Sequence, residues 1–215
     1  YPDLDIKDLF KESNIKSTFW ANKWKVYGEG IVGVIEGLVF PDYKIIDHIN
    51  QLAKHISYGL DFGFTNDPTV LVKLAKISGT LEAEQLIYKR GLTNPAISRE
   101  LEKLGFNKRD TIYADSAEPK SIRTIQLSGI TIKGVTKGRD SINYGIDVMQ
   151  REDYLVTSQS TNLIKELRSY CWDTDKTGKR LNKPIDNFNH RIDAVRYHKM
   201  ETLGMNNNYG SYNIL

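Results

Sequence analysis

Apolar and polar positions alternate along residues 58–64, Tyr-Gly-Leu-Asp-Phe-Gly-Phe. Period-two alternation with aromatic residues predicts a half-buried β-strand. One face of this strand carries the large apolar side chains, and the other carries Gly59, Asp61 and Gly63. Glycine inside a strand often marks a place where a ligand or another backbone comes close. The second face therefore indicates either a metal or phosphate site built on Asp61, or a solvated aspartate at a strand end.

The pattern after this strand predicts strands first and then an alternation of helices and strands. A turn at residues 65–68, ending in Pro68, separates the opening strand from two more apolar runs, and the three strands form an antiparallel meander. Asn94 is expected to cap the first helix, with Pro95 at its first position. The elements predicted after the opening strand are strands 69–77 and 81–88, helix 94–104, strand 111–115, helix 118–127, strand 131–135, helix 140–150, strand 154–156, helix 161–171, a basic hairpin or loop at 173–180, and helix 189–202. This order favours an α/β fold with a mixed central sheet flanked by helices.

Length and composition predict one domain with an appendage. The chain has 215 residues, of which 40% are hydrophobic and 27% charged, an ordinary globular composition. We expect residues 1–57 to be an appendage, residues 58–203 the domain, and residues 204–215 a mobile tail. The apolar run 31–35 is broken by Glu36 and is too short to span a bilayer, so no membrane partner is expected. Cys171 is the only cysteine, which excludes an intrachain disulfide and a cysteine-rich zinc site.

Charge is distributed unevenly along the chain. The net charge is +3, but residues 120–183 hold 12 lysines and arginines against 7 acidic residues. A basic half beside a carboxylate-bearing half fits a polyanionic substrate held over a metal-loaded centre, although a solvated surface gives the same count. The glycines between residues 28 and 37 are not followed by a phosphate-loop lysine, and the chain has no G-x-x-x-x-G-K-[ST] motif.

Two further aspartates stand at positions that suit a site. Asp115 ends the strand 111–115, and in open α/β sheets sites lie at the carboxyl ends of parallel strands. Asp115 or Ser116 could instead simply cap the next helix. Asp193 lies inside the last helix, where His190, Asp193, Ala194 and Tyr197 fall on one face. An exposed Asp193 paired with Arg191 or Arg196 is the alternative.

Three carboxylates from separate elements suggest a particular chemistry. Hard oxygen ligands without cysteine favour Mg²⁺ or Mn²⁺ over zinc. Two such ions are a recurrent device for phosphodiester hydrolysis, and they need several acids at one point.

The motifs together resemble the nuclease domain of tailed-bacteriophage terminase large subunits. The resemblance rests on the segments 58–64 with 66–69, 112–119 and 190–197, and on the leading segments 24–30 and 36–41, which look like the part that joins that family's ATPase domain to its nuclease. It implies a ribonuclease H-like fold in which the first and fourth strands are neighbours. It also implies that Asp61, Asp115 and Asp193 are catalytic and bind two Mg²⁺ or Mn²⁺ ions, with Asp67 a further ligand.

The same resemblance implies the rest of the expected function. The chain would cut concatemeric double-stranded DNA with little sequence specificity during genome packaging, in the host cell cytoplasm and outside the mature virion. The basic segment 176–183 would lie near DNA, with Lys176, Lys179, Arg180 and Lys183 as backbone contacts. His190 shares the helical face of Asp193, which fits either a histidine that orients that acid or a purely structural histidine. The family's ATPase half, with its phosphate-binding loop, is missing from this sequence, so we expect an isolated nuclease fragment or a truncated gene product. The expected partners in the full-length protein are that ATPase domain, a small terminase subunit and the portal.

Three alternatives stay open on the sequence. Another ribonuclease H-like enzyme, such as a Holliday-junction resolvase or a transposase, would use the same acids on a different substrate. An actin- or Hsp70-like ATPase has a similar first strand, but no second glycine-rich phosphate loop is present. A non-catalytic DNA- or portal-binding module would leave the acids purely structural.

Overall fold

The structure is a computed structural model that describes residues 37–53, 55–77, 79–106, 108–135, 141–175, 179–185, 190 and 192–197. These residues form two compact units, one containing residues 42–164 and 190–197 and the other residues 37–41 and 165–185. Most of the expected appendage 1–57 and all of the expected tail 204–215 lie outside the described residues. None of the described helices is long and apolar enough to cross a membrane.

The larger unit is built on a mixed sheet, as the alternation of elements predicts. Within the described residues the sheet has seven strands in the order β1-β7-β4-β3-β2-β5-β6. The strands are β1 (Lys44–Ile46), β2 (His55–Asp61), β3 (Thr69–Ile77), β4 (Thr80–Lys89), β5 (Thr111–Asp115), β6 (Thr131–Val135) and β7 (Asp153–Thr157). The meander β2-β3-β4 is antiparallel, and the other strands join it in parallel. Lys44–Ile46, from the segment expected to be an appendage, is an edge strand of this sheet.

Strand β2 lies inside the sheet, and its pairing with β5 brings two of the predicted acids together. It pairs in parallel with β5, with Leu60 opposite Ala114, so Asp61 and Asp115 follow side by side at the carboxyl ends of neighbouring strands. The adjacency implied by the resemblance is therefore confirmed. The strand starts three residues earlier than predicted and ends at Asp61, because residues 62–64 turn into a loop. Thr69 closes this loop by donating its hydroxyl to the carbonyl of Gly63 at 2.7 Å.

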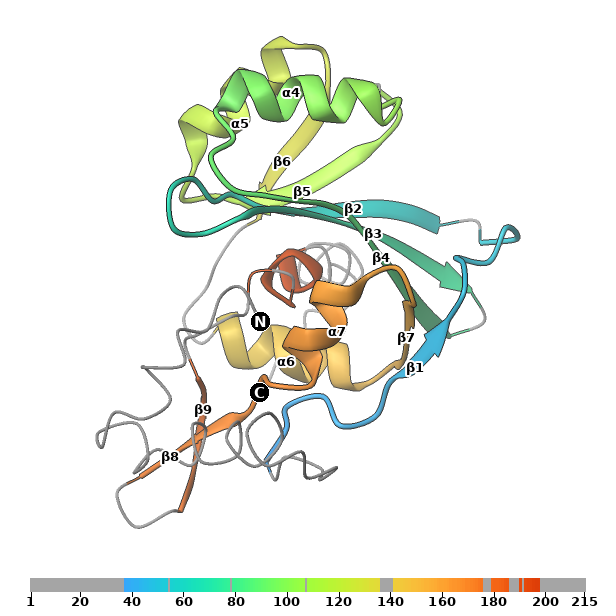
Figure 1. Cartoon of the computed structure of the whole chain (residues 1–215), viewed down its shortest axis with the longest axis vertical. Coiled ribbons are helices and arrows are strands. Elements are labelled where there is room, and N and C mark those ends of the chain that lie inside the picture. Colours follow the sequence, from blue (N-terminus) through green and yellow to red (C-terminus); the bar gives the residue numbers. More distant parts are fainter. Residues whose placement is uncertain are drawn as a thin grey trace, which may run out of the picture. The chain divides into compact units, whose positions relative to one another are not determined.

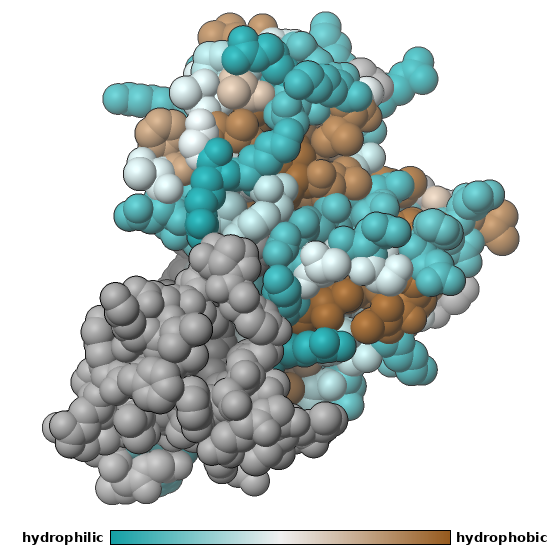
Figure 2. Space-filling model, in the orientation of Figure 1, coloured by the Kyte–Doolittle hydropathy of each residue, from teal (hydrophilic) through white to brown (hydrophobic). Residues whose placement is uncertain are grey.

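Helices cover the two faces of the sheet. The described helices are α4 (Asn94–Lys103), α5 (Pro119–Leu127), α6 (Ser141–Gln150) and α7 (Thr161–Leu167), together with a last helix of which residues 190 and 192–197 are described. Helices α4 and α5 lie on one face of the strands β2, β3, β5 and β6, and the last helix lies on the opposite face (Figure 1). Figure 2 shows hydrophilic side chains over the outer side of α4 and apolar ones where it meets the sheet.

The main core lies between β2, β5 and the helices α4 and α5. It contains Leu60, Ile97, Leu101, Ile112 and Ile125, all at most 1% exposed. Because Leu60 faces this core, the alternation of the strand sends Asp61 and Gly59 to the opposite face, where the last helix packs. The period-two pattern thus fixes which face of the sheet carries the carboxylate.

Two predicted helix ends are wrong. Thr93 rather than Asn94 occupies the cap position of α4, with no side-chain hydrogen bond. Helix α7 ends at Leu167 instead of Cys171, because the amides of Ser169 and Tyr170 both turn back to the carbonyl of Glu166.

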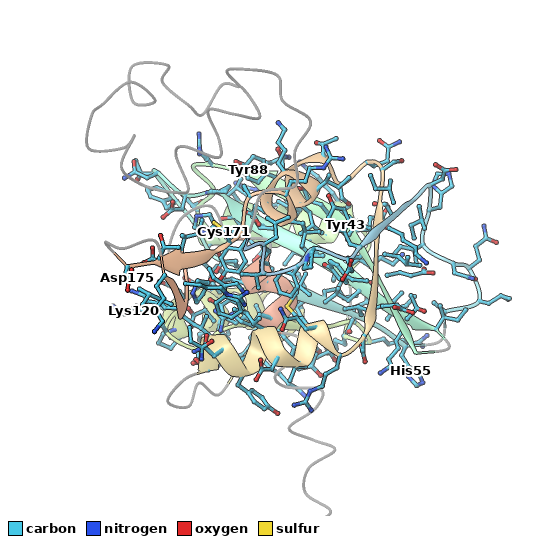
Figure 3. All side chains as sticks on the ribbon, turned by 90° about the horizontal axis from the view of Figure 1, so that it is seen from below. Tyr43, His55, Tyr88, Lys120, Cys171 and Asp175 are labelled. Atoms are coloured by element: carbon cyan, nitrogen blue, oxygen red, sulfur yellow. The ribbon has the colours of Figure 1, made fainter. Side chains whose placement is uncertain are left out.

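The smaller unit holds the expected basic hairpin. Strands β8 (Trp172–Thr174) and β9 (Arg180–Pro184) are antiparallel, and Leu38 bridges to Cys171. Cys171, labelled in Figure 3, is buried. The guanidinium of Arg180 lies 5.0 Å above the ring of Trp172. Lys176 lies outside the described residues.

Candidate active site

Asp61 is the most enclosed of the three predicted acids. It ends β2 and is 7% exposed. Burial raises the pKa of its carboxyl to about 6, the hydrogen bond from His190 lowers it in part, and the negative charges of Asp193 and Asp115 raise it further. A carboxylate that two others repel inside the protein is a position where added positive charge would be favoured.

The last helix reaches this face of the sheet because Gly59 has no side chain. A Cβ built on Gly59 would lie 1.8 Å from the backbone carbonyl oxygen of Ala194. Of the two possibilities that the strand glycine indicated, a nearby ligand or a nearby backbone, the structure shows the backbone approach. Gly63 plays a corresponding part in the loop after β2, where a Cβ would lie 2.4 Å from the carbonyl oxygens of Asp67 and Pro68.

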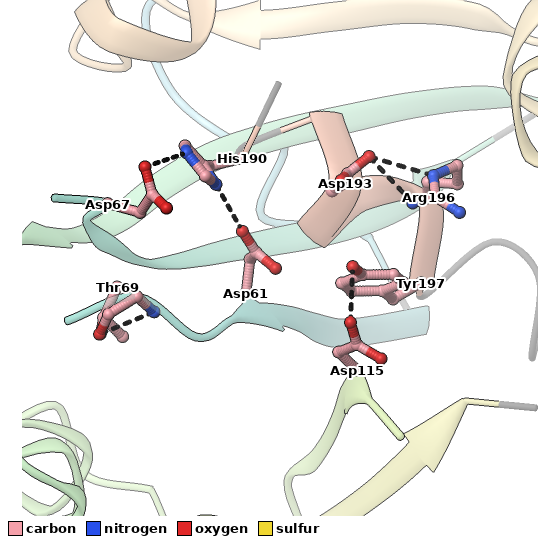
Figure 4. A network of polar contacts seen from close by, with 9 residues as sticks. Asp61, Asp67, Thr69, Asp115, His190, Asp193, Arg196 and Tyr197 are labelled. Carbon is pink, nitrogen blue, oxygen red and sulfur yellow. Dashed lines mark hydrogen bonds and ion pairs between the residues drawn. The ribbon is translucent and has the colours of Figure 1, made fainter. Parts of the chain in front are cut away.

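His190 bridges two of the predicted acids (Figure 4). Its Nδ1 lies 2.9 Å from Oδ2 of Asp61, and its Nε2 lies 3.2 Å from Oδ1 of Asp67. A ring protonated on both nitrogens donates to both carboxylates. These contacts follow from the position of His190 at the start of the described helix, where it lies over the end of β2 and the loop that follows. The orientation of Asp193 by His190 stays a prediction.

Asp193 is held by its own helix. Both Nε and Nη2 of Arg196 donate to Oδ1 of Asp193, at 3.1 and 3.0 Å. The side chain of Arg196 is 4% exposed and that of Asp193 is 17% exposed. The pairing with Arg196 that the sequence allowed therefore exists, but it is largely buried. The negative charge of Asp193 also raises the pKa of Asp61.

Both carboxylate oxygens of Asp115 accept a hydrogen bond. The amide of Ala117 donates to its Oδ1 at 2.9 Å, and the hydroxyl of Tyr197 donates to its Oδ2 at 3.2 Å. The contact with Ala117 is a local turn in the loop after β5 and not a helix cap, because the cap position of α5 is Glu118 and has no side-chain capping hydrogen bond. The capping role that the sequence allowed for Asp115 or Ser116 is therefore wrong. The contact with Tyr197 comes from the last helix, 82 positions along the chain.

The arrangement unites Asp61, Asp67, Asp115 and Asp193 around one helix, yet each acid has a protein partner. Among the described residues, no three Asp, Glu, His or Cys side chains are grouped so as to hold a metal ion as they stand. The side chains nevertheless suit a hard divalent cation, because they offer carboxylate oxygens. Burial and the negative charges of Asp193 and Asp115 raise the pKa of Asp61, so a cation beside it would be favourable.

Sequence reasoning did not assign roles to Arg196 and Tyr197. Tyr197 falls seven positions after His190 on the same helical face, and that spacing was the available signal for it. Arg196 was considered only as a surface partner of Asp193.

The topology defines the class of the fold. A meander followed by parallel strands beside its first member, with acids at the ends of the first and fourth of these strands and on a last helix, is a ribonuclease H-like arrangement. The family described as Terminase RNAseH like domain matches residues 61–199, and this chain belongs to that family.

Comparisons with known sequences agree. The chain is 31% identical over 179 residues to the terminase large subunit of Bacillus phage SPP1, covering 79% of this chain and 41% of that protein. It is 26% identical over 185 residues to the PBSX phage terminase large subunit of Bacillus subtilis (strain 168), covering 81% of this chain and 42% of that protein. It thus spans less than half the length of these curated relatives.

Solved structures show the same fold. The g2p (large terminase) nuclease domain from bacteriophage SPP1, solved with bound Mn, aligns with a TM-score of 0.67 and 27% identity over 77% of this chain and 98% of that chain. The nuclease domain of the P22 large terminase aligns with a TM-score of 0.60 and 14% identity over 78% of this chain and 93% of that chain, a likeness of fold alone. The sequence-based prediction of a terminase nuclease domain is confirmed.

Proposed function

We propose that this chain is a divalent-metal-dependent endonuclease that cuts double-stranded DNA with little sequence specificity. The observation that carries the proposal is the meeting of Asp61 and Asp115 at the ends of neighbouring strands, with Asp193 close enough to perturb Asp61. The SPP1 nuclease domain, 27% identical to this chain, was solved with bound Mn. We further propose that the full-length protein acts with an ATPase domain, a small terminase subunit and the portal in packaging viral DNA in the host cytoplasm.

The residues that would hold the ions are Asp61, Asp115 and Asp193, with Asp67 as an additional ligand. When bound, two Mg²⁺ or Mn²⁺ ions supply activation of the attacking water and stabilisation of the departing 3′ oxygen. The chain's own part is to bring together carboxylates from the ends of β2 and β5, the loop after β2 and the last helix. The ring nitrogens of His190 lie within hydrogen-bond distance of Asp61 and Asp67, and Arg196 donates to Asp193. Each carboxylate keeps further lone pairs with which it would bind a cation.

Incubation of plasmid DNA with the purified chain tests this proposal. We expect nicking and linearisation in Mn²⁺ or Mg²⁺ and none in EDTA. Asp115→Asn keeps the shape of the side chain and should lose the activity, since an amide is a poor ligand for a divalent cation. Cutting by Asp115→Asn at the parental rate would contradict the assignment of the site. Cutting of four-way junctions in preference to linear duplex would favour a resolvase instead.

The basic hairpin provides a second prediction. Lys179 and Lys183 flank Arg180 on or beside β9 and are proposed to contact the DNA backbone. Replacing both lysines with alanine should weaken binding of unrelated duplexes equally and reduce the slope of log K against log salt by about 2, because each phosphate contact contributes about 0.9. Fluorescence anisotropy over a salt series measures both quantities.

A charge-matched control is available in Lys76 and Lys103. Each is paired with a carboxylate, Glu152 and Glu100 respectively, in the larger unit. Replacing both with alanine removes the same formal charge and should leave the salt slope unchanged. Equal losses in the two double variants would show that net charge, not the hairpin, governs binding.

A further inference from the structure

Tyr197 joins the last helix to the end of β5 through a single hydroxyl. Its ring is 3% exposed and packs with Tyr113 and Val135, which lie on β5 and β6. The guanidinium of Arg196 lies 5.0 Å from the ring centroid. The aromatic body is therefore anchored independently of the hydroxyl, which points at Oδ2 of Asp115 (Figure 4).

The hydroxyl of Tyr197 suits a site that gathers carboxylates. An uncharged phenol donates one hydrogen bond, which Oδ2 of Asp115 accepts at 3.2 Å, and it adds no charge to the site.

The two donors on Asp115 define its orientation. Ala117 donates to Oδ1 and Tyr197 to Oδ2, so rotation of the carboxylate would break one bond or both. Each carboxylate oxygen has two lone pairs, so neither of these bonds uses up the oxygen that accepts it. An oxygen oriented by one donor can still bind a cation through its second lone pair.

We propose that Tyr197 is a positioning residue of the nuclease site, whose hydroxyl holds the Asp115 carboxylate in the orientation in which it binds a divalent cation. This inference rests on the proposed function. Tyr197 acts on the cation only through Asp115. Partners that orient metal ligands in this way typically contribute a factor of about 10 to 100 in metal affinity or activity.

Tyr197→Phe tests the proposal, because it removes the hydroxyl and keeps the ring that packs on Tyr113. The probe is Mn²⁺ alone, titrated into the metal-free chain and followed by the electron paramagnetic resonance signal of free Mn²⁺. We expect binding about 10- to 100-fold weaker than in the parent. Plasmid cleavage by the variant should recover as Mn²⁺ is raised, since the lost step is ligand positioning.

Tyr154→Phe is the matched control. Tyr154 is a buried tyrosine, 5% exposed, on β7, which is separated from β2 by β4 and β3. Removal of the Tyr154 hydroxyl should leave the Mn²⁺ affinity and the rate of plasmid cleavage unchanged. Parental Mn²⁺ affinity in Tyr197→Phe would overturn the proposal.

A metal-free measurement separates this inference from the proposed function. The ¹³C resonance of the Asp115 carboxyl should move in Tyr197→Phe and stay in place in Tyr154→Phe. An unmoved resonance would mean that the hydroxyl does not hold Asp115, and it would overturn the inference even if the parent cuts DNA. A parent that binds no Mn²⁺ would overturn the proposed function, and with it the purpose assigned to the bond, while the resonance still reports whether the bond exists.

Discussion

Asp61→Asn is expected to abolish DNA cleavage and at the same time to stabilise the metal-free protein. The loss of cleavage should be on the order of 1,000-fold or more, because an essential ligand is removed without changing the shape of the side chain. The gain in stability follows from burial. Asp61 is nearly enclosed, and its folded-state pKa is raised from 3.8 to about 6.

The pH dependence of this gain has a definite sign. Below about pH 4 Asp61 is protonated in both the folded and the unfolded state, so the charge contributes no penalty. As the pH rises from about 4 to 6, the unfolded state loses the proton first and the parent loses stability. Above about pH 6 the penalty is complete, at about 3 kcal/mol from a shift of 3.8 to 6. Asp61→Asn should be more stable than the parent by that amount only above about pH 6.

Urea unfolding in EDTA at several pH values between 4 and 8 measures this difference. Asp47→Asn is the control, because Asp47 is exposed and the substitution removes the same charge. Its effect should stay within about 0.5 kcal/mol at every pH. If Asp61→Asn were less stable than the parent at pH 8, burial would not be the dominant influence on this carboxyl.

Gly59→Ala is expected to damage both the fold and the site. A methyl group at this position would meet the carbonyl oxygen of Ala194 at 1.8 Å, and because that atom belongs to the backbone, no rotamer change relieves the contact. We expect a loss of about 3 kcal/mol or more in the free energy of unfolding, at the upper end for overpacking. Cleavage and Mn²⁺ binding should fall even where the variant is folded, because displacement of the helix moves His190, Asp193 and Tyr197 away from β2.

Gly134→Ala is a suitable comparison. Gly134 is also a strand glycine, and a Cβ there would meet its nearest neighbours, in Ile122 and Ser116, at 3.2 Å. A shift of a few tenths of an ångström relieves that contact, so the cost should be below about 1 kcal/mol. Urea unfolding and the plasmid assay compare the two variants. Equal effects of the two substitutions would show that the approach of the last helix to β2 does not require glycine.

The fold could be predicted where local pattern decides it. Strands β3, β5 and β6 match their predicted bounds, because each is an apolar run between clear turn signals. The end of α7 was missed because the turn back to the carbonyl of Glu166 has no clear signal in the sequence. The start of β2 was missed because its pairing with β3, with His55 opposite Lys76, decides it. The pairing of β2 with β5 could come only from the resemblance, since spacing along the chain does not specify which strands are neighbours.

The candidate site, too, could be predicted from the sequence only in part. The positions of Asp61 and Asp115 follow from strand alternation and strand ends, and the approach near Gly59 follows from its missing side chain. The partners of each acid do not follow, because hydrogen bonds such as those of His190 and Tyr197 depend on how the last helix lies on the sheet. A helical periodicity identifies the face that is presented, but not the atoms that it meets.

The dependence of the site on its last helix has a consequence for the order of synthesis. Asp61 and its partner His190 are 129 positions apart, and Asp115 and Tyr197 are 82 apart. A ribosome therefore completes the whole sheet before it delivers the helix that carries Asp193. Until then the chain carries the first two acids without the third, so the proposed site stays incomplete until residues 190–197 have been synthesised.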